Sequence, residues 1–317
     1  MGLLDEYAIT PEVFIQDSYA SVELGRERLL NLKDLLIQEA VTRDFRGGDW
    51  YNQAFSGQNT LHPNGKELLK KIKQQGRIRS TPPLTSNVPV SDVEWGEDAV
   101  GSHTQDPLNG VIVSDDSLPS FQGNTIVGCL GTIRSCNWWQ NRSNSIRIHK
   151  QIIDYKGALQ TILETANHIM FIDPHINPTQ DRYKNLLDLI VIAGVKRPRT
   201  KIEIHRRSYI GSGPSRTPVA PGDWELSFSR EWANSAQQHD FEIEVFIWED
   251  FHDRYLISNL CGIDIPYGFD VETSRDPAKL NQLTTWTRIG RDTRDSVMKE
   301  FENNVGPHRL VHQFTIK

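Results

Sequence analysis

Residues 241–254, FEIEVFIWEDFHDR, place an apolar run directly before a dense group of charged and imidazole side chains. Two earlier stretches repeat this pattern: residues 168–176 read HIMFIDPHI, and residues 200–207 read TKIEIHRR. Short apolar runs rich in β-branched and aromatic residues are typical of buried strands. The three stretches therefore predict three strands, each followed by polar residues.

Helical patterns separate these strands along the chain. We expect helices over residues 157–166, 183–193, 225–239 and 291–303, and a hairpin formed by residues 255–258 and 262–265. Strand-like sequence also begins near Asn124. Alternating helices and apolar strands indicate βαβ units. The prediction is an α/β domain over residues 123–317, with a mixed or parallel sheet and flanking helices.

The N-terminal part, residues 1–122, gives a weaker pattern. Apolar residues repeat at helical spacing within residues 18–43, and a second helix is expected at residues 65–75. Residues 80–122 are rich in Pro, Ser, Gly and Asp, which favours irregular backbone. We therefore predict a smaller helical region with an irregular linker, which would dock a partner or contact nucleic acid.

A local basic run and a tryptophan pair are the only features of the N-terminal half of the chain suited to nucleic acid. Basic side chains beside aromatic rings can bind single strands, although such a run more often forms a solvated helix face, and a tryptophan pair more often lies in the core. The residues concerned are Lys66, Lys70, Lys71, Lys73, Arg77, Arg79, Trp138 and Trp139.

Composition excludes several classes of protein. The chain of 317 residues is 37% hydrophobic and 24% charged, as in ordinary globular proteins. No apolar run approaches the roughly 20 residues of a membrane span, and acidic residues near the N-terminus argue against a signal peptide, so we expect a cytoplasmic protein. Three scattered cysteines suit buried thiols better than disulfides or zinc. The net charge of −6 means that nucleic-acid binding would need a local basic patch.

The polar groups after the three strands are the candidates for chemistry. If the strands are parallel and adjacent, Asp173-Pro174-His175, His205-Arg206-Arg207 and Glu249–Arg254 meet at one edge of the sheet. Each group also has a plain structural interpretation. Asp-Pro commonly makes a turn, single histidines are often just hydrogen-bonded, and an arginine pair can be solvated.

The strings HDRYLIS (252–258) and GIDIPYGFD (262–270), with IMFIDPHI upstream, resemble the phospholipase D-like domain found at the C-terminus of MIT-domain proteins and in bacterial proteins. The resemblance covers about half of the chain. Active members of that superfamily use a histidine that attacks phosphorus, a cation that neutralises the phosphate, and an aspartate. The resemblance implies that His252 is the nucleophile and that Arg254 binds the phosphate.

The match to the superfamily pattern has two departures. Asn259 stands where the aspartate is expected, so Asp253, Asp173 or Asp270 would have to replace it. The superfamily site also takes one histidine from each of two halves, whereas this chain shows one clear copy. Either His205-x-Arg207 is a degenerate second half, or two chains pair; we favour a homodimer.

We therefore predict a phosphodiesterase, most simply a metal-independent nuclease of a prokaryotic antiviral defence system, without cofactor. An inactive domain that senses a phosphorylated ligand is the alternative, and a pure interaction protein is a third possibility. The predicted catalytic residues are His252, Arg254, His205, Asn259, Asp173 and His175, and the predicted phosphate-binding residues are Arg207, Arg206, Asp253, Asp270, Thr284 and Thr285.

Overall fold

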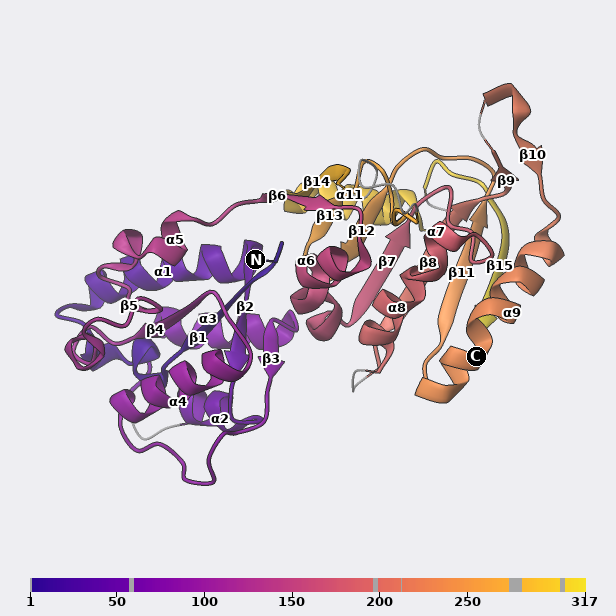
Figure 1. Ribbon diagram of the computed structural model, residues 1–317. Helices are drawn as coiled ribbons and strands as arrows, with labels where there is room; N and C mark the ends of the chain where they lie inside the picture. The colour runs from indigo at the N-terminus through magenta and orange to yellow at the C-terminus, as the bar shows by residue number, and fades with distance from the viewer. Residues whose placement is uncertain (1, 57–59, 196–198, 212, 274–280, 303–305) are drawn as a thin grey trace. The chain divides into compact units, whose positions relative to one another are not determined.

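The computed structural model describes residues 2–56, 60–195, 199–211, 213–273, 281–302 and 306–317, and divides into two compact units (Figure 1). The first unit comprises Leu3–Ser143 and the second Asn144–Lys317. The predicted boundary after residue 122 is wrong, because the strand-like sequence near Asn124 belongs to the first unit. There, Val127–Cys129 forms a strand that pairs with Gly110–Val113.

The first unit is an α/β domain, so the prediction of a helical region with an irregular linker is wrong. Its five parallel strands lie in the order β3-β2-β1-β4-β5. The strands are β1 (Asp5–Ile9), β2 (Ala40–Asp44), β3 (Ile78–Ser80), β4 (Gly110–Val113) and β5 (Val127–Cys129). The helices are α1 (Val22–Gln38), α2 (Asp49–Ser56), α3 (Pro63–Gln74), α4 (Asp92–Gln105) and α5 (Asn137–Gln140).

Buried charged residues explain why β1 and β2 were not predicted from the sequence. Glu6 in β1 accepts hydrogen bonds from Nε and Nη2 of Arg43 in β2, both at 2.8 Å, and Arg79 joins them at 3.1 Å. Charged residues inside a strand remove the apolar signature that marks it in a sequence. Arg79 is thus held by carboxylates, and the buried Arg77 donates to a backbone carbonyl. The basic run therefore does not act as one free patch.

Residues 80–122 contain regular structure as well. Ser91 accepts a hydrogen bond from the Glu94 amide, and the Glu94 carboxylate accepts one from the Val90 amide, which starts α4 in the manner of a capping box. Strand β4 follows and is fully buried. The Pro- and Ser-rich composition marked the turns correctly but concealed the helix and the strand between them.

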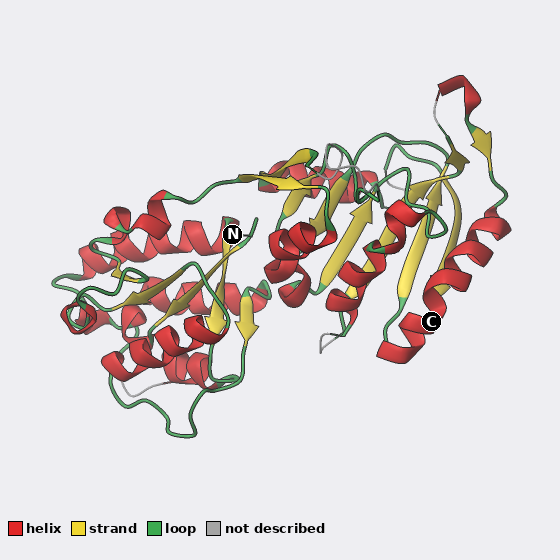
Figure 2. Cartoon of the chain, viewed as in Figure 1, coloured by secondary structure: helices red, strands yellow, loops and turns green. Residues whose placement is uncertain are grey.

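The second unit contains the predicted parallel strands within an eight-stranded mixed sheet (Figure 2). The strand order is β15-β11-β8-β7-β12-β13-β14-β6, in which β7, β8 and β11 are parallel and the remaining pairings are antiparallel. The strands are β6 (Ser145–His149), β7 (His168–Ile172), β8 (Lys201–Arg207), β11 (Ile243–Trp248), β12 (Tyr255–Ser258), β13 (Gly262–Asp264), β14 (Leu283–Ile289) and β15 (Leu310–Ile316). The predicted α/β class is confirmed.

Helices cover the sheet of this unit, and a short ribbon made of β9 (Tyr209–Ile210) and β10 (Thr217–Pro218) extends from it. An aromatic cluster with Trp248 and Phe301 fills the core between the sheet and α11. The helices are α6 (Ile152–Thr165), α7 (Asp181–Lys184), α8 (Leu186–Gly194), α9 (Pro221–His239) and α11 (Arg291–Glu300). None of the helices in the described ranges has the length and apolar character needed to cross a bilayer.

Candidate functional site

The polar segments after β7, β8 and β11 lie at one edge of the sheet, as predicted. Ile172 at the end of β7 pairs with His205, and Trp248 at the end of β11 pairs with Arg207. Because the three strands run in the same direction, the segments that follow them leave the sheet side by side. This edge is the candidate site.

Asp173 is the buried anchor of the edge. Its carboxylate accepts hydrogen bonds from the His175 amide at 2.8 Å, the Phe269 amide at 3.1 Å and the Tyr183 hydroxyl at 3.2 Å. Burial raises the pKa of Asp173, and these hydrogen bonds together with Arg254 act in the opposite direction. A carboxylate that is occupied in this way positions the surrounding loops.

Arg254 lies over this anchor. Its Nε is 3.9 Å from Oδ1 of Asp173, and its Nη1 donates to the His252 and Pro266 carbonyls, both at 3.4 Å. These contacts are long, and 28% of the side chain is exposed. The guanidinium is therefore held in place but keeps donors available for an anion.

His175 is an uncharged imidazole among arginines. Burial, followed by the positive charges of Arg207, Arg254 and Arg182, lowers its pKa from 6.5 to about 4. Nη2 of Arg207 lies 3.3 Å from Nδ1 of His175. Because arginine can only donate, Nδ1 is the acceptor and the ring proton resides on Nε2. The Nε2–H group can therefore donate to a bound oxygen.

Arg207 has unused hydrogen-bonding capacity. It is 3% exposed, and it donates to His175 and to the Gly211 carbonyl. Its Nε is buried without a partner in the described ranges, and the nearest carboxylate oxygen in an ion pair, Oδ1 of Asp250, is 3.9 Å from Nη1. A buried guanidinium without a close carboxylate is suited to binding an external anion.

His252 is the exposed member of the site. It lies on the segment that joins β11 to β12, two residues before Arg254. Within the described parts of the chain its ring has neither a hydrogen bond nor an ion pair, so a ring nitrogen is accessible from solvent. No carboxylate there orients this ring.

The prediction that His205 is catalytic is wrong. The side chain is fully buried and stacks on Phe246, with ring centroids 4.7 Å apart. Its Nε2 lies 3.0 Å from Glu203, and its Nδ1 accepts from Trp248 at 3.1 Å. Both ring nitrogens are thus occupied inside the core beneath α11. Burial also lowers the pKa of His205.

Arg206 is also misassigned as a phosphate ligand. It is 1% exposed and donates to the carbonyls of Ile176, Arg207 and Tyr209 at 2.6–2.8 Å. Its guanidinium carbon lies 3.2 Å from the centre of the Trp224 ring. Arg206 therefore ties the loops after β7 and β8 together. Backbone carbonyls thus take up the donors of Arg206, whereas Arg207 contacts His175 and keeps an unpartnered Nε in the described ranges.

Asn259 lies at the opposite edge of the sheet, so its predicted catalytic role is wrong. Its Oδ1 accepts from the Asn167 amide at 2.8 Å and the His168 amide at 3.3 Å, at the start of β7. Four strand residues separate it from Arg254, which at about 3.4 Å per residue amounts to roughly 17 Å.

The remaining predicted ligands lie around the edge or away from it. Oδ2 of Asp270 accepts from Lys150 Nζ at 2.8 Å, and its Oδ1 is buried without a hydrogen-bond partner in the described ranges. Thr284 is buried in β14 and Thr285 in the same strand is exposed, and neither is brought to the arginines by a contact in the described ranges. Asp253 also makes no side-chain hydrogen bond or ion pair with the arginines in the described ranges.

Sequence reasoning missed two contributors from the segment after Asp173. Tyr183 donates to Asp173, and Arg182 is one of the charges that lower the pKa of His175. Both come from α7, a short helix that the sequence pattern merged with α8. The only signal was their position after a predicted strand end.

Comparisons with known proteins add little. No family model matches the chain, and no curated protein matches it. Among the solved structures that match is TrmBL2, an archaeal chromatin protein whose structure shows a mode of DNA binding. The identity is 14%, the match covers 76% of this chain and 80% of that chain, and the TM-score is 0.28. We therefore infer function from the residues of this chain.

Proposed function

We propose that the second unit is a phospholipase D-like phosphodiesterase that cleaves nucleic acid without a metal at the reacting phosphate. The observation that carries the proposal is the uncharged His175 set among arginines at the sheet edge that also bears the exposed His252. Arginine side chains recognise phosphate oxygens, and an uncharged imidazole is a competent nucleophile or donor. The resemblance to phospholipase D supports this proposal and suggests the setting of prokaryotic defence.

The chemistry assigns a separate task to each group. A ring nitrogen of His252 attacks phosphorus, the phosphorus–oxygen bond to the leaving nucleotide breaks, and the leaving oxygen takes a proton from water. A second water then attacks phosphorus, the nitrogen–phosphorus bond breaks, and the released proton neutralises the hydroxide from the first step. Arg254, Arg207 and the Nε2–H of His175 stabilise the charge on the non-bridging oxygens.

One observation favours a second candidate function, phosphate binding without cleavage. Superfamily catalysis uses a carboxylate to support the imidazolium form of the nucleophile. The described residues place no carboxylate on the His252 ring, and Asp173 is engaged with Tyr183, Phe269 and His175. A sensor or adaptor would need the arginines and would not need His252.

Cleavage and binding, measured on the same variants, separate the two functions. Labelled single- and double-stranded DNA and RNA are incubated in EDTA with the wild type, His252→Ala and Arg254→Ala, and binding is followed by fluorescence anisotropy. His239→Ala, at the end of α9, is the control. We expect His252→Ala to lose cleavage by about 10³-fold or more with little change in binding, and Arg254→Ala to lose both.

Each other outcome has a definite meaning. Binding by the wild type that Arg254→Ala abolishes, without cleavage of any substrate, would replace the nuclease by the phosphate-binding function. A wild type that neither binds nor cleaves these nucleic acids would overturn both.

A further inference from the structure

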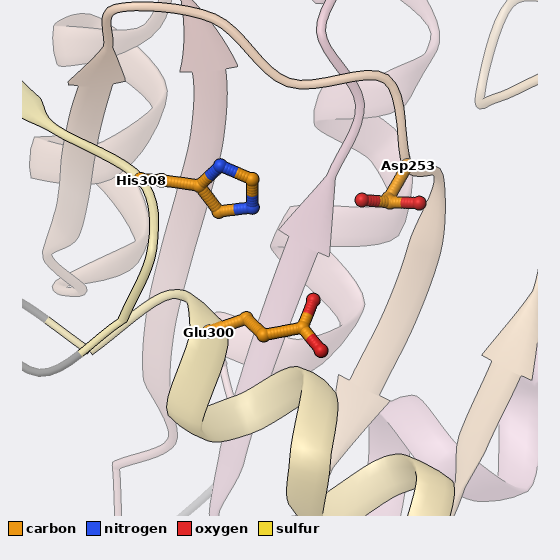
Figure 3. A group of neighbouring side chains, drawn as sticks. All are labelled: Asp253, Glu300 and His308. Carbon is orange, nitrogen blue, oxygen red and sulfur yellow. The ribbon is translucent and has the colours of Figure 1, made fainter.

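Three side chains outside the arginine cluster form a second group with metal-binding chemistry (Figure 3). Asp253 comes from the segment between β11 and β12, Glu300 from the end of α11, and His308 from the segment before β15. One ligand atom from each lies within 4.8 Å of the others. The three segments are distant in sequence, so the fold is what brings these ligands together.

Hydrogen bonding does not account for this arrangement. Within the described ranges, no hydrogen bond or ion pair joins any two of the three side chains, and neither Asp253 nor Glu300 has a lysine or arginine partner. Nε2 of His308 is buried without a hydrogen-bond partner. Figure 3 shows a ring nitrogen of His308 facing the two carboxylates. Two half-buried carboxylates and an unsatisfied imidazole nitrogen thus face a common space.

An ion would satisfy all three groups. Two ligands of a tetrahedral Zn²⁺ are about 3.4 Å apart at bond lengths near 2.1 Å, so modest side-chain rotations would bring these three groups to bonding distance of one ion. The imidazole nitrogen favours a transition metal, whereas Mg²⁺ and Ca²⁺ prefer oxygen ligands alone. We propose that Asp253, Glu300 and His308 bind a divalent transition-metal ion, Zn²⁺ or Mn²⁺, with water in the remaining positions.

The ion would fix the segment that carries the proposed site. Asp253 lies between His252 and Arg254, so a metal bond to its carboxylate holds that segment against α11 and residues 306–309. The metal site does not depend on the proposed function, since it uses none of the phosphate-binding arginines. It also leaves the sequence-based expectation of metal-free chemistry at the phosphate unchanged.

Direct metal binding tests the proposal without an activity assay. The metal-free full-length protein is titrated with Mn²⁺ and with Zn²⁺ by calorimetry, and Mn²⁺ is also followed by electron paramagnetic resonance. Variants are Asp253→Asn, Glu300→Gln and His308→Ala, and Glu302→Gln, an exposed carboxylate just after α11, is the control. Circular dichroism of the metal-free variants confirms that each is folded.

We expect one ion per chain in the wild type and in the control. Each ligand variant should weaken binding by at least about 10-fold, because altering even an outer-shell partner of a metal ligand costs about 10- to 100-fold, and His308→Ala should remove the nitrogen coupling from the Mn²⁺ spectrum. Millimolar Mg²⁺ should not displace the bound ion. No binding by the wild type, or unchanged binding in all three folded ligand variants, would overturn the site.

Discussion

At the scale of single residues, the charge state of His175 is the feature on which the candidate site depends. Burial is the larger cause of its low pKa of about 4, and the surrounding arginines add to it. An imidazole that stays neutral at physiological pH can contact phosphate oxygens through Nε2–H while Arg207 and Arg254 carry the charge. His175 thus supplies a neutral hydrogen-bond donor beside two positively charged arginines.

Removing one of these positive charges should raise the pKa of His175. We expect Arg207→Met to shift it upward by about one unit, as measured by NMR titration of the ring protons, with the signal assigned through His175→Gln. Arg230→Met is the control because its side chain is 85% exposed on α9. An unchanged His175 pKa in Arg207→Met would show that burial alone sets it.

The same shift predicts the pH dependence of folding. The folded-state pKa of about 4 lies below the ordinary value of 6.5, so the unfolded chain binds the proton more tightly. This contribution to stability is fully present above pH 6.5 and is lost as the pH falls toward 4. After solvent screening we expect a loss of about 1–2 kcal/mol in the wild type relative to His175→Gln, measured by urea unfolding across that range.

At the scale of elements, predictability followed the apolar content of each strand. β7, β8 and β11 were predicted from apolar runs, and their parallel alignment brought Asp173, His175, Arg207 and Arg254 to one edge as expected. β1 and β2 were missed because Glu6 and Arg43 form a buried pair inside them. The faces of β8 could not be assigned from sequence either, because both sides are buried. His205 and Arg206 were wrongly included because the sequence does not show that both side chains are fully buried with their polar atoms already hydrogen-bonded.

The loop after β13 holds the most demanding backbone position of the site. Gly268 has a φ of 75°, and a Cβ there would lie 2.1 Å from Oδ2 of Asp173. We expect Gly268→Ala to destabilise the fold by at least about 2 kcal/mol, since both the conformation and the close approach exclude a side chain. Gly268→Ala should also weaken oligonucleotide binding.

Gly290→Ala is the matched control, because no atom of the described residues beyond its chain neighbours lies within 4 Å of the corresponding Cβ. Urea unfolding of the two variants provides the comparison. Equal stability of Gly268→Ala and Gly290→Ala would mean that the loop can move away from Asp173, and the anchor role of that carboxylate would then be wrong.

At the scale of the whole molecule, the burial of His205 decides how a two-histidine site can be completed. If the proposed phospholipase D-like function uses two histidines, His205-x-Arg207 cannot supply the second one from within the core. His175 offers a second imidazole in the same chain, and a second copy of the chain offers another His252. The proposed homodimer is the arrangement in which two equivalent edges meet about a two-fold axis.

Mass and complementation distinguish these arrangements. If the site is shared, light scattering should give about twice the chain mass of 36.2 kDa at the concentrations at which cleavage is observed. Mixing His252→Ala with Arg254→Ala chains should then restore part of the activity, since a mixed dimer can combine one intact residue of each kind. If the active species instead has the mass of a single chain, His175 would be the second histidine. His175→Gln should then lose as much cleavage as His252→Ala.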